Sequence, residues 1–412
     1  MRYVSGPYTS GQLLTNIRAV EDWIANEFSA RGPITDAAVQ RDMANRMLDV
    51  SQGRNSCMFD DQGNPSIMVR IPAMLLSQLR ADWPKELHPA FIVGASVKSE
   101  FWIGKYQGAT AGAGAAERAI SLRRRDPRAF INFDQARTVC SAKGAGWHLM
   151  TNAEWALLAL WCKANGYWPR GNNSYGADMS RPAETGEISY TYTSGSTVYN
   201  GRVAAGTGPA AWSHDGTPFG VWDLNGNVWE WVGGLRLVDG EIQILPNNNA
   251  ADGAADQSGA STAWRAILPD GSLVDPGAAD TLKFDSPAPL TNDEDAQNLG
   301  LPILRTALVN PPDQAWNWGD NYYDYNCGEF QSVTAAPEVI VPRLLQVLSL
   351  MPIDADHGGD YLYTRNYGER LPFRGGNWTN GAAAGVCALR LDFTRADSSL
   401  RGYGFRPAFI QP

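Results

Sequence analysis

The chain has 412 residues, of which 44% are hydrophobic and 10% aromatic, so it is long enough to bury a sizeable core in two or three globular units. Its net charge of −9 and its pI near 5.1 argue against a nucleic-acid partner, because neutralising phosphates requires a basic face. Five widely spaced cysteines without a CxxC pair predict buried thiols rather than a disulfide framework or a metal site.

The N-terminal sequence has no feature of an export signal. Its first residues lack an apolar run behind basic residues, and no later segment approaches the roughly 20 apolar residues that cross a bilayer. We therefore expect a soluble protein without a membrane span, which does not leave the cell by the usual signal-peptide route.

The first 89 residues predict a small N-terminal module. Apolar residues recur at helical spacing over 10–30 and again behind a Thr35 cap. Residues 56–71 alternate around a central turn, which predicts a hairpin, and 72–90 predict a short helix. We expect this module, residues 1–89, to dock to other proteins or to drive oligomerisation.

The next part of the chain predicts strands followed by two helices. Residues 90–107 have the pattern of strands, and 131–144 that of an amphipathic helix. A second helix is predicted over 150–166, where Thr151 and Glu154 have the spacing of a capping box.

Residues 234–345 are rich in Asn, Asp, Gly, Ala and Pro, with only short apolar runs. This composition predicts long loops inserted between core strands, or a partly ordered subdomain. An aromatic tract, AWNWGDNYYDYN at 315–326, could serve as a binding surface or pack as an ordinary loop, and Tyr361, Tyr363 and Tyr367 leave the same two alternatives.

Residues 374–406, which we call the framed segment, have ordered ends and an irregular centre. Arg374, Gly375, Gly376 and Trp378 stand at one end, and Gly404, Phe405 and Arg406 at the other. We expect glycine turns at Gly375-Gly376 and at Gly404, anchored by the bulky and cationic residues beside them.

The centre of the framed segment predicts a strand over 386–392. Its alternation would turn Cys387, Leu389 and Leu391 inward. The residues then expected to face solvent are Ala388, Arg390 and Asp392.

Several motifs in this order resemble the formylglycine-generating-enzyme (sulfatase-modifying factor) branch of the C-type lectin fold. They are FWIGKYQ, FDQARTVCSAKGAGWHLMTNAEW, PRGNN, FGVWDLNGNVWEWVGG, FRGGNW and GFRPAF. The resemblance implies an α+β fold of this subtype over 90–412, with the long insertion at 234–345, behind the N-terminal module. It does not by itself imply a ligand.

The resemblance also implies a calcium ion held by side-chain and main-chain oxygens. Carried over by position, its ligands would be Asp223, Gly226, Val228 and Glu230, and oxygen ligands suit a hard cation. The alternative is that Asp223 and Glu230 cap turns or pair with an arginine.

The oxidase activity of the family implies two cysteines that this chain lacks. Their positions hold Asn380 and Gly385, and the one thiol nearby, Cys387, belongs to the inward face. The segments Glu-Pro-Asn, Gln-Pro-Asp and Trp-Asn-Asp, which bind sugars through calcium in animal lectins, are also absent. We expect a non-catalytic protein; the alternative is an oxidase of this type or a related metal-assisted enzyme.

The framed segment is similar to the C-terminal segment of variable proteins of diversity-generating retroelements. The shared pattern is Arg-Gly-Gly-x-Trp, then Ala-Gly-Val-x-x-Leu, then Gly-Phe-Arg. In such systems a reverse transcriptase with errors at template adenines rewrites selected codons, mostly Asn-type ones, which cannot yield Lys, Gln, Glu or Met. None of these four residue types occurs between Arg374 and Arg406.

This resemblance implies a ligand-binding face of variable positions. They are Asn377, Thr379, Asn380, Ala383, Ala388, Arg390, Asp392, Phe393, Thr394, Ala396, Asp397, Ser399, Leu400, Arg401 and Tyr403. It further implies a phage tail protein, part of the virion, that binds a bacterial surface protein or glycan, contacts other tail proteins and forms a homo-oligomer such as a trimer. The alternatives are a location on the bacterial surface and a structural virion protein with a vestigial frame.

Overall fold

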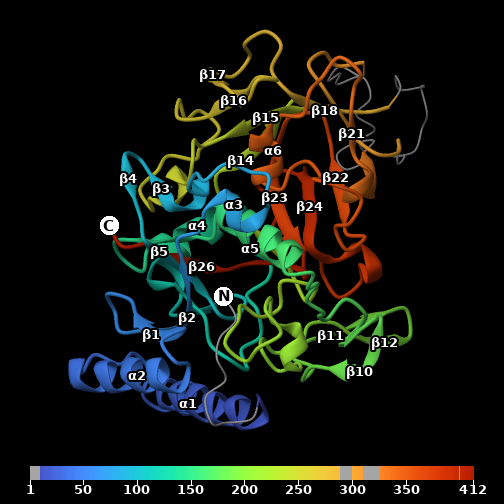
Figure 1. The fold of residues 1–412 in the computed structure, drawn as a ribbon. Helices are drawn as coiled ribbons and strands as arrows, with labels where there is room; N and C mark the ends of the chain where they lie inside the picture. The colour runs from blue at the N-terminus through green and yellow to red at the C-terminus, as the bar shows by residue number, and fades with distance from the viewer. Residues whose placement is uncertain (1–9, 288–298, 310–324, 399) are drawn as a thin grey trace.

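The structure is a computed structural model that describes residues 10–287, 299–309, 325–398 and 400–412 (Figure 1). The α-helices within these ranges are α1 (Ser10–Arg31), α2 (Ala37–Val50), α3 (Leu76–Leu79), α4 (Phe133–Ser141), α5 (Asn152–Ala164) and α6 (Arg343–Val347). In this part of the chain, each helix is too short or too polar to cross a membrane.

Helices α1 and α2 lie together at one end of the molecule (Figure 1). The cap of α2 is Asp36 rather than the expected Thr35, because Asp36 Oδ1 accepts the N–H groups of Ala38 at 2.7 Å and Val39 at 3.3 Å. A cap must lie directly before the first helical residue for its side chain to reach these groups.

Helix α1 is joined to the body of the protein by a buried carboxylate. Glu21 accepts hydrogen bonds from Lys105 Nζ at 2.6 Å and from Tyr106 Oη at 2.7 Å. Both Glu21 and Lys105 are fully buried. The N-terminal helices are therefore attached to the strand that ends at residue 104.

A five-stranded sheet contains the N-terminal hairpin. Its order is β1-β2-β5-β26-β8, with β1 (Asn55–Phe59), β2 (Pro65–Pro72), β5 (Glu100–Gly104), β26 (Pro407–Phe409) and β8 (Trp147–Leu149). The hairpin predicted over 56–71 is confirmed. The expected boundary at residue 89 does not separate it from the rest, because β2 pairs with β5 along its length and β26 closes the same sheet.

The two helices predicted over 131–144 and 150–166 are confirmed as α4 and α5. Thr151 Oγ1 accepts the N–H of Glu154, and Glu154 Oε2 accepts the N–H of Thr151 at 2.9 Å, which is the expected capping box. Helix α5 is apolar on every side and lies in the main core.

A thirteen-stranded sheet forms the other large part of the fold. Its central order is β20-β22-β24-β23-β14. Its strands are β13 (Trp229–Trp231), β14 (Leu235–Val238), β15 (Glu241–Ile244), β16 (Arg265–Ile267), β17 (Leu273–Val274), β18 (Lys283–Asp285), β19 (Ile303–Arg305), β20 (Asn326–Glu329), β21 (Thr334–Ala335), β22 (Tyr361–Thr364), β23 (Glu369–Gly375), β24 (Gly385–Phe393) and β25 (Tyr403–Phe405).

The insertion at 234–345 is more ordered than a set of loops. Its strands β14 to β19 extend the large sheet by antiparallel pairing, and β15 to β18 lie in the upper part of Figure 1. The expectation of a partly ordered subdomain therefore fits better than that of loops alone. Most of the aromatic tract 315–326 lies outside the described residues, so its two alternatives stay open.

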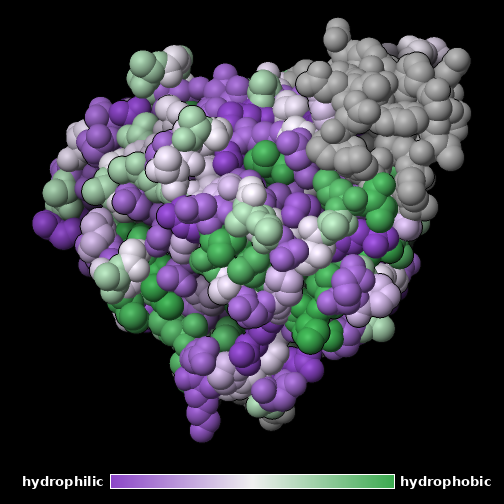
Figure 2. Space-filling model, turned by 90° about the horizontal axis from the view of Figure 1, so that it is seen from above, coloured by the Kyte–Doolittle hydropathy of each residue, from purple (hydrophilic) through white to green (hydrophobic). Residues whose placement is uncertain are grey.

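Four small hairpins complete the fold. They are β3 (Ile92–Val93) with β4 (Ser96–Val97), β6 (Ala109–Ala111) with β7 (Arg118–Ile120), β9 (Ala177–Asp178) with β10 (Arg181–Thr185), and β11 (Thr191–Ser194) with β12 (Thr197–Asn200). The last two occupy one corner of the molecule, at the lower right of Figure 1. Seen from the end that carries the insertion, apolar residues form separate areas among polar ones (Figure 2).

Arg406, at the C-terminal end of the framed segment, is fully buried and ion-paired. Its guanidinium donates to both carboxylate oxygens of Glu230, at 2.9 and 2.7 Å. It also donates to the carbonyl oxygens of Gly104 and Trp222, each at 2.8 Å. Arg406 therefore connects β5 and β13, and its N–H groups donate to buried acceptors.

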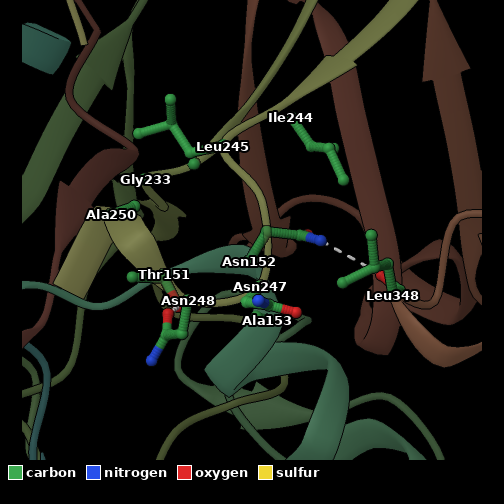
Figure 3. A pocket seen from close by; sticks show the side chains of 11 residues that line it. Thr151, Asn152, Ala153, Gly233, Ile244, Leu245, Asn247, Asn248, Ala250 and Leu348 are labelled. Atoms are coloured by element: carbon green, nitrogen blue, oxygen red, sulfur yellow. Dashed lines mark hydrogen bonds between the residues drawn. The ribbon is translucent and has the colours of Figure 1, made fainter. Parts of the chain in front are cut away.

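Arg374, at the other end, is equally buried but contacts only neutral acceptors. It donates to Asn152 Oδ1 at 3.1 and 2.7 Å and to the carbonyl oxygen of Ser349 at 3.0 Å. Burial lowers the pKa of Arg374 to about 9. Asn152 also donates to the carbonyl oxygen of Leu348 at 3.1 Å, beside a cavity of about 10 Å³ that could hold no more than one water molecule (Figure 3).

The two glycine positions of the frame differ. Gly375 and Gly376 have the left-handed φ values of 94° and 85° that suit glycine, but Gly375 ends β23 and the turn itself follows at residues 378–379. Gly404 instead lies inside β25, where an added Cβ would come within 3.0 Å of the carbonyl oxygen of Arg128. The glycine is required there by close packing rather than by a turn.

We predict that Gly376→Ala destabilises the protein by about 2–4 kcal/mol, from backbone strain plus a steric clash. The new Cβ would lie 2.4 Å from the Cβ of Ala384. Gly277→Ala is the matched control, because Gly277 has a similar φ of 80° but no atom within 4 Å, and it should cost only about 1 kcal/mol. Urea unfolding of both variants measures the difference, and equal losses would contradict the packing of the frame.

Candidate functional site

Strand β24 confirms the inward half of the predicted alternation but not the outward half. Cys387, Leu389 and Leu391 lie in the main core as expected. Ala388 and Asp392 were expected to face solvent, yet they are 0% and 4% exposed. The prediction fails for them because the second face of β24 is also covered, by a cluster of aromatic residues from β13, β23 and β25.

The positions that the resemblance implies to be variable fall into three groups of exposure. Those exposed to solvent are Thr379, Thr394, Ala396 and Arg401. Those partly exposed are Asn377, Asn380, Ala383, Arg390, Phe393, Asp397 and Leu400. Those buried are Ala388, Asp392 and Tyr403, and Ser399 lies outside the described residues.

Arg390 is the centre of a polar and aromatic cluster on the second face of β24. Its guanidinium donates to both oxygens of Asp392, at 2.8 and 3.1 Å, and to Tyr403 Oη at 2.9 Å. It also lies over the rings of Phe393 and Tyr363, 4.5 and 4.9 Å from their centroids. Burial disfavours its charge, but the carboxylate of Asp392 together with the hydroxyls of Tyr403 and Tyr363 outweighs this and raises the pKa of Arg390.

A second group of aromatic residues, which the sequence reasoning missed, lies beside the frame. Residues 189–201, here called the tyrosine hairpin, contain β11 and β12. The guanidinium of Arg401 lies 3.9 Å from the ring centroid of Tyr192, and the same ring lies 6.4 Å from that of Trp378. Alternating Tyr and Thr around Ser-Gly, in SYTYTSGSTVYNG, was the signal that could have predicted this hairpin.

Several large apolar side chains on and near the tyrosine hairpin are exposed. Eight large apolar side chains are exposed within the described residues, and five of them lie close together in sequence. These five are Tyr175, Met179, Ile188, Val198 and Tyr199. Exposed apolar residues concentrated in one region are typical of an interaction surface.

Gly385, one of the two positions expected to hold a cysteine, borders an open cavity of about 560 Å³. At Gly385, an added Cβ would lie 2.0 Å from Asp360 Oδ1, so the Asp360 carboxyl fills the space that a cysteine side chain would need. Asp360 Oδ2 accepts the N–H of Cys387 at 2.7 Å, and burial raises the pKa of Asp360 well above its usual value. Burial also raises the pKa of the Cys387 thiol, which disfavours a reactive thiolate.

The four residues implied as calcium ligands do converge on one point. The main-chain oxygens of Asp223, Gly226 and Val228 and the Oε1 of Glu230 all lie 3.0–3.3 Å from the side-chain nitrogen of Gln107. Calcium–oxygen distances are about 2.3–2.6 Å, and here an amide nitrogen lies at the centre of the ring. The residues present therefore fit an amide donor and do not fit a cation without a rearrangement of Gln107.

Three of the four carboxylate oxygens near this ring have other partners, whereas the buried Oδ1 of Asp223 has no hydrogen-bond partner among the described residues. Glu230 is ion-paired with Arg406, which matches the alternative of an arginine partner. Asp223 Oδ2 accepts the N–H of Gly206 at 2.8 Å, and burial raises the pKa of Asp223 to about 6. Among the described residues, His, Cys, Asp and Glu side chains do not form a group of three or more that could hold a metal ion.

Comparison with known protein families identifies one match. Residues 39–237 match the FGE-sulfatase family, described as a sulfatase-modifying factor enzyme 1-like domain. An FGE-sulfatase domain is therefore present, and it begins inside α2 and ends in β14. The match includes the ring around Gln107 but not the framed segment. No match is found among curated proteins.

We predict that Arg390→Ala destabilises the protein by about 1–3 kcal/mol, because it leaves the buried carboxylate of Asp392 without its charged partner. Arg401→Ala is the control, since that side chain is exposed and its removal should change stability by no more than about 0.5 kcal/mol. Thermal and urea unfolding of the two variants give the comparison. An unaltered stability for Arg390→Ala would show that its contacts do not support the fold.

We predict that Gly385→Ala costs about 1–3 kcal/mol through its clash with Asp360. Combined with Asp360→Ala, which removes the clashing oxygens, the total loss should be about 1–2 kcal/mol smaller than the sum of the single losses. Gly259→Ala serves as the control, because its nearest atom would be 3.8 Å away. Additive losses in urea unfolding would mean that the carboxyl does not fill the cysteine position.

Proposed function

We propose that this chain is a non-catalytic receptor-binding protein of the C-type lectin fold, with a binding face diversified by a retroelement. The observation that carries the proposal is the contrast within the framed segment. Arg374 and Arg406 at its ends are fully buried, whereas Thr379, Thr394 and Arg401 between them are exposed. A surface whose side chains vary needs a backbone that is held in place by residues that do not vary.

The chemistry of the partly open positions supports binding. Arg390 and Phe393 are partly exposed and lie together with Tyr363, and Arg and aromatic residues dominate the energy of protein interfaces. The ion pair between Arg390 and Asp392 also limits variation, because changing one partner alone leaves the other without its counter-charge. We infer that these two positions vary together, whereas the exposed positions vary independently.

The tyrosine hairpin adds a fixed part to the proposed binding face. It consists of Tyr, Ser, Thr, Gly and Asn with one Val, a composition close to that of antibody binding loops. Tyrosine offers a large contact area at a low cost in conformational entropy, since its side chain has only two χ angles. Contacts of Tyr192 with Arg401 and Trp378 make the hairpin continuous with the framed segment.

The same region supports a non-catalytic role. Asn380 and Gly385 supply no thiol, and the carboxyl of Asp360 fills the space beside Gly385. An oxidase or metal-assisted enzyme is the alternative function. It would need a nucleophile from elsewhere in the chain, and Cys387 is buried with a raised pKa.

The proposed location is a phage tail, with a location on the bacterial surface as the alternative. This assignment rests on the similarity of the framed segment to variable proteins of retroelements. The receptor would be a bacterial surface protein or glycan. Helices α1 and α2, at one end of the molecule (Figure 1), are the proposed contact with other tail proteins or with further copies in a trimer.

We predict that exchanging the exposed variable positions changes which bacteria the protein binds. The exchange would replace Thr379, Thr394, Ala396 and Arg401 with residues of another permitted set. Arg390, Asp392 and the frame stay unchanged, so the fold should keep its melting temperature. Adsorption of virions, or of the labelled full chain, to a panel of bacterial strains measures the result.

A matched exchange on another surface, Val97→Ser with Ile340→Ser, provides the control, because both side chains are exposed and remote in sequence. The control should bind the same strains as the wild type. Identical adsorption by the wild type and the exchanged protein would contradict the proposed face. The proposal that a retroelement diversifies this segment would be rejected if the neighbouring DNA lacks a reverse-transcriptase gene and a near-copy of the 374–406 coding stretch.

A further inference from the structure

The side-chain amide of Gln107 lies at the centre of the oxygen ring described above. Its nitrogen is 3.1 Å from the carbonyl oxygen of Asp223, 3.3 Å from that of Gly226 and 3.1 Å from that of Val228. It is 3.0 Å from Glu230 Oε1, and Gln107 is fully buried. All four neighbours of this nitrogen are acceptors, so its electropositive hydrogens face the oxygens from which a cation would be bound.

The orientation of this amide follows from backbone groups whose roles are fixed. The N–H of Val203 donates to Asn227 at 2.8 Å, so the atom that accepts it must be the Oδ1 of Asn227. The Nδ2 of Asn227 therefore faces the other way, and it donates to Gln107 Oε1 at 2.8 Å and to the carbonyl oxygen of Val203 at 3.0 Å. The nitrogen of Gln107 must then face the ring, because the opposite orientation would place two donors and five oxygens against each other.

The charges around the ring agree with a neutral group at its centre. The carboxylate of Glu230 is already compensated by Arg406, which donates to both of its oxygens. The other three oxygens belong to neutral carbonyl groups. A divalent cation placed here would lie close to the Arg406 guanidinium, and it would have to displace the Gln107 amide and break its hydrogen bond with Asn227.

We propose that Gln107 is a built-in substitute for the cation of this site, so that the fold of this chain does not depend on calcium. The two amide hydrogens carry a partial positive charge, which holds the four oxygens together as a metal ion would. Unlike a bound metal ion, the amide stays in place when calcium is scarce. The same geometry implies that Gln107→Glu re-creates a site for a hard divalent cation. A carboxylate in this position adds a fifth oxygen and a negative charge, so the oxygens repel one another. A calcium ion bound among the five oxygens relieves this repulsion. This inference does not depend on the proposed binding function.

The test compares the calcium dependence of stability in the wild type and in Gln107→Glu. The melting temperature of the full-length wild type should be the same in the chelator EGTA and in millimolar calcium chloride. Gln107→Glu should melt several degrees lower than the wild type in EGTA, and its melting temperature should rise with calcium concentration, because a ligand that binds only the native state stabilises it by mass action. Isothermal titration with calcium should detect binding to the variant alone.

Gln257→Glu is the matched control. Gln257 is also buried, and its side-chain oxygen accepts the N–H of Gly234, so the control introduces a carboxylate into the interior away from the ring. Its stability should be lower than that of the wild type and should not respond to calcium. Gln107→Met, which keeps the shape but removes the donor, should be destabilised equally in EGTA and in calcium.

Three results would overturn the proposal. The first is a wild type that loses stability in EGTA and regains it with calcium, since the ring would then hold a cation in place of the amide. The second is a Gln107→Glu variant with equal melting temperatures in both buffers. If that variant is unfolded when purified, refolding from urea decides the matter, and failure to refold in millimolar calcium also counts against the proposal.

Discussion

The buried ion pair between Arg406 and Glu230 is the interaction on which the two sheets depend. Glu230 belongs to β13 in the large sheet, and Arg406 follows β25 and leads directly into β26 in the five-stranded sheet. The guanidinium also holds the carbonyl oxygen of Gly104, at the end of β5. Removing either partner of such a pair leaves a buried charge without compensation, which typically costs about 3–5 kcal/mol. The C-terminal end of the framed segment is therefore fixed by the core itself.

The N-terminal end of the framed segment is also fixed by a buried arginine, but without an ion pair. Arg374 has no carboxylate beside it, and its donors are used on Asn152 and on main-chain oxygens. Between the two arginines, β24 is covered on both faces, so sequence variation there is limited to residues that fit the interior. The loops on either side of β24, at 377–383 and 394–401, carry the exposed positions. The frame thus combines buried ends with exposed positions in the loops between them.

At two places that the resemblance to the FGE-sulfatase family associates with its chemistry, a side chain of this chain occupies the position of an expected group. At Gly385 the Asp360 carboxyl fills the space of a cysteine side chain, and in the oxygen ring the Gln107 amide takes the position of a cation. In both cases a side chain from another segment supplies the contacts that the interior requires. The matched family supports the fold more directly than it supports an activity.

Local sequence patterns were sufficient for the elements and for part of the frame. The Thr151–Glu154 capping box and the hairpin over 56–71 depend on contacts within a few residues, and both are confirmed. Gly375 and Gly376 have positive φ, as a glycine pair allows, although the turn itself follows them. Alternation in β24 identified the inward face, but whether Asp392 faces solvent depends on what covers the second face, and those strands are distant in sequence.

The motif FWIGKYQ marked the fold, yet nothing in it indicates that the side chain of Gln107 reaches Asp223 and Glu230, more than a hundred residues away. The sequence by itself therefore determined the local elements, the absence of the two cysteines and the positions of the frame. Only the tertiary structure decided which variable residues are exposed and which group fills the oxygen ring, because burial and hydrogen-bond partners are properties of segments brought together from different parts of the chain.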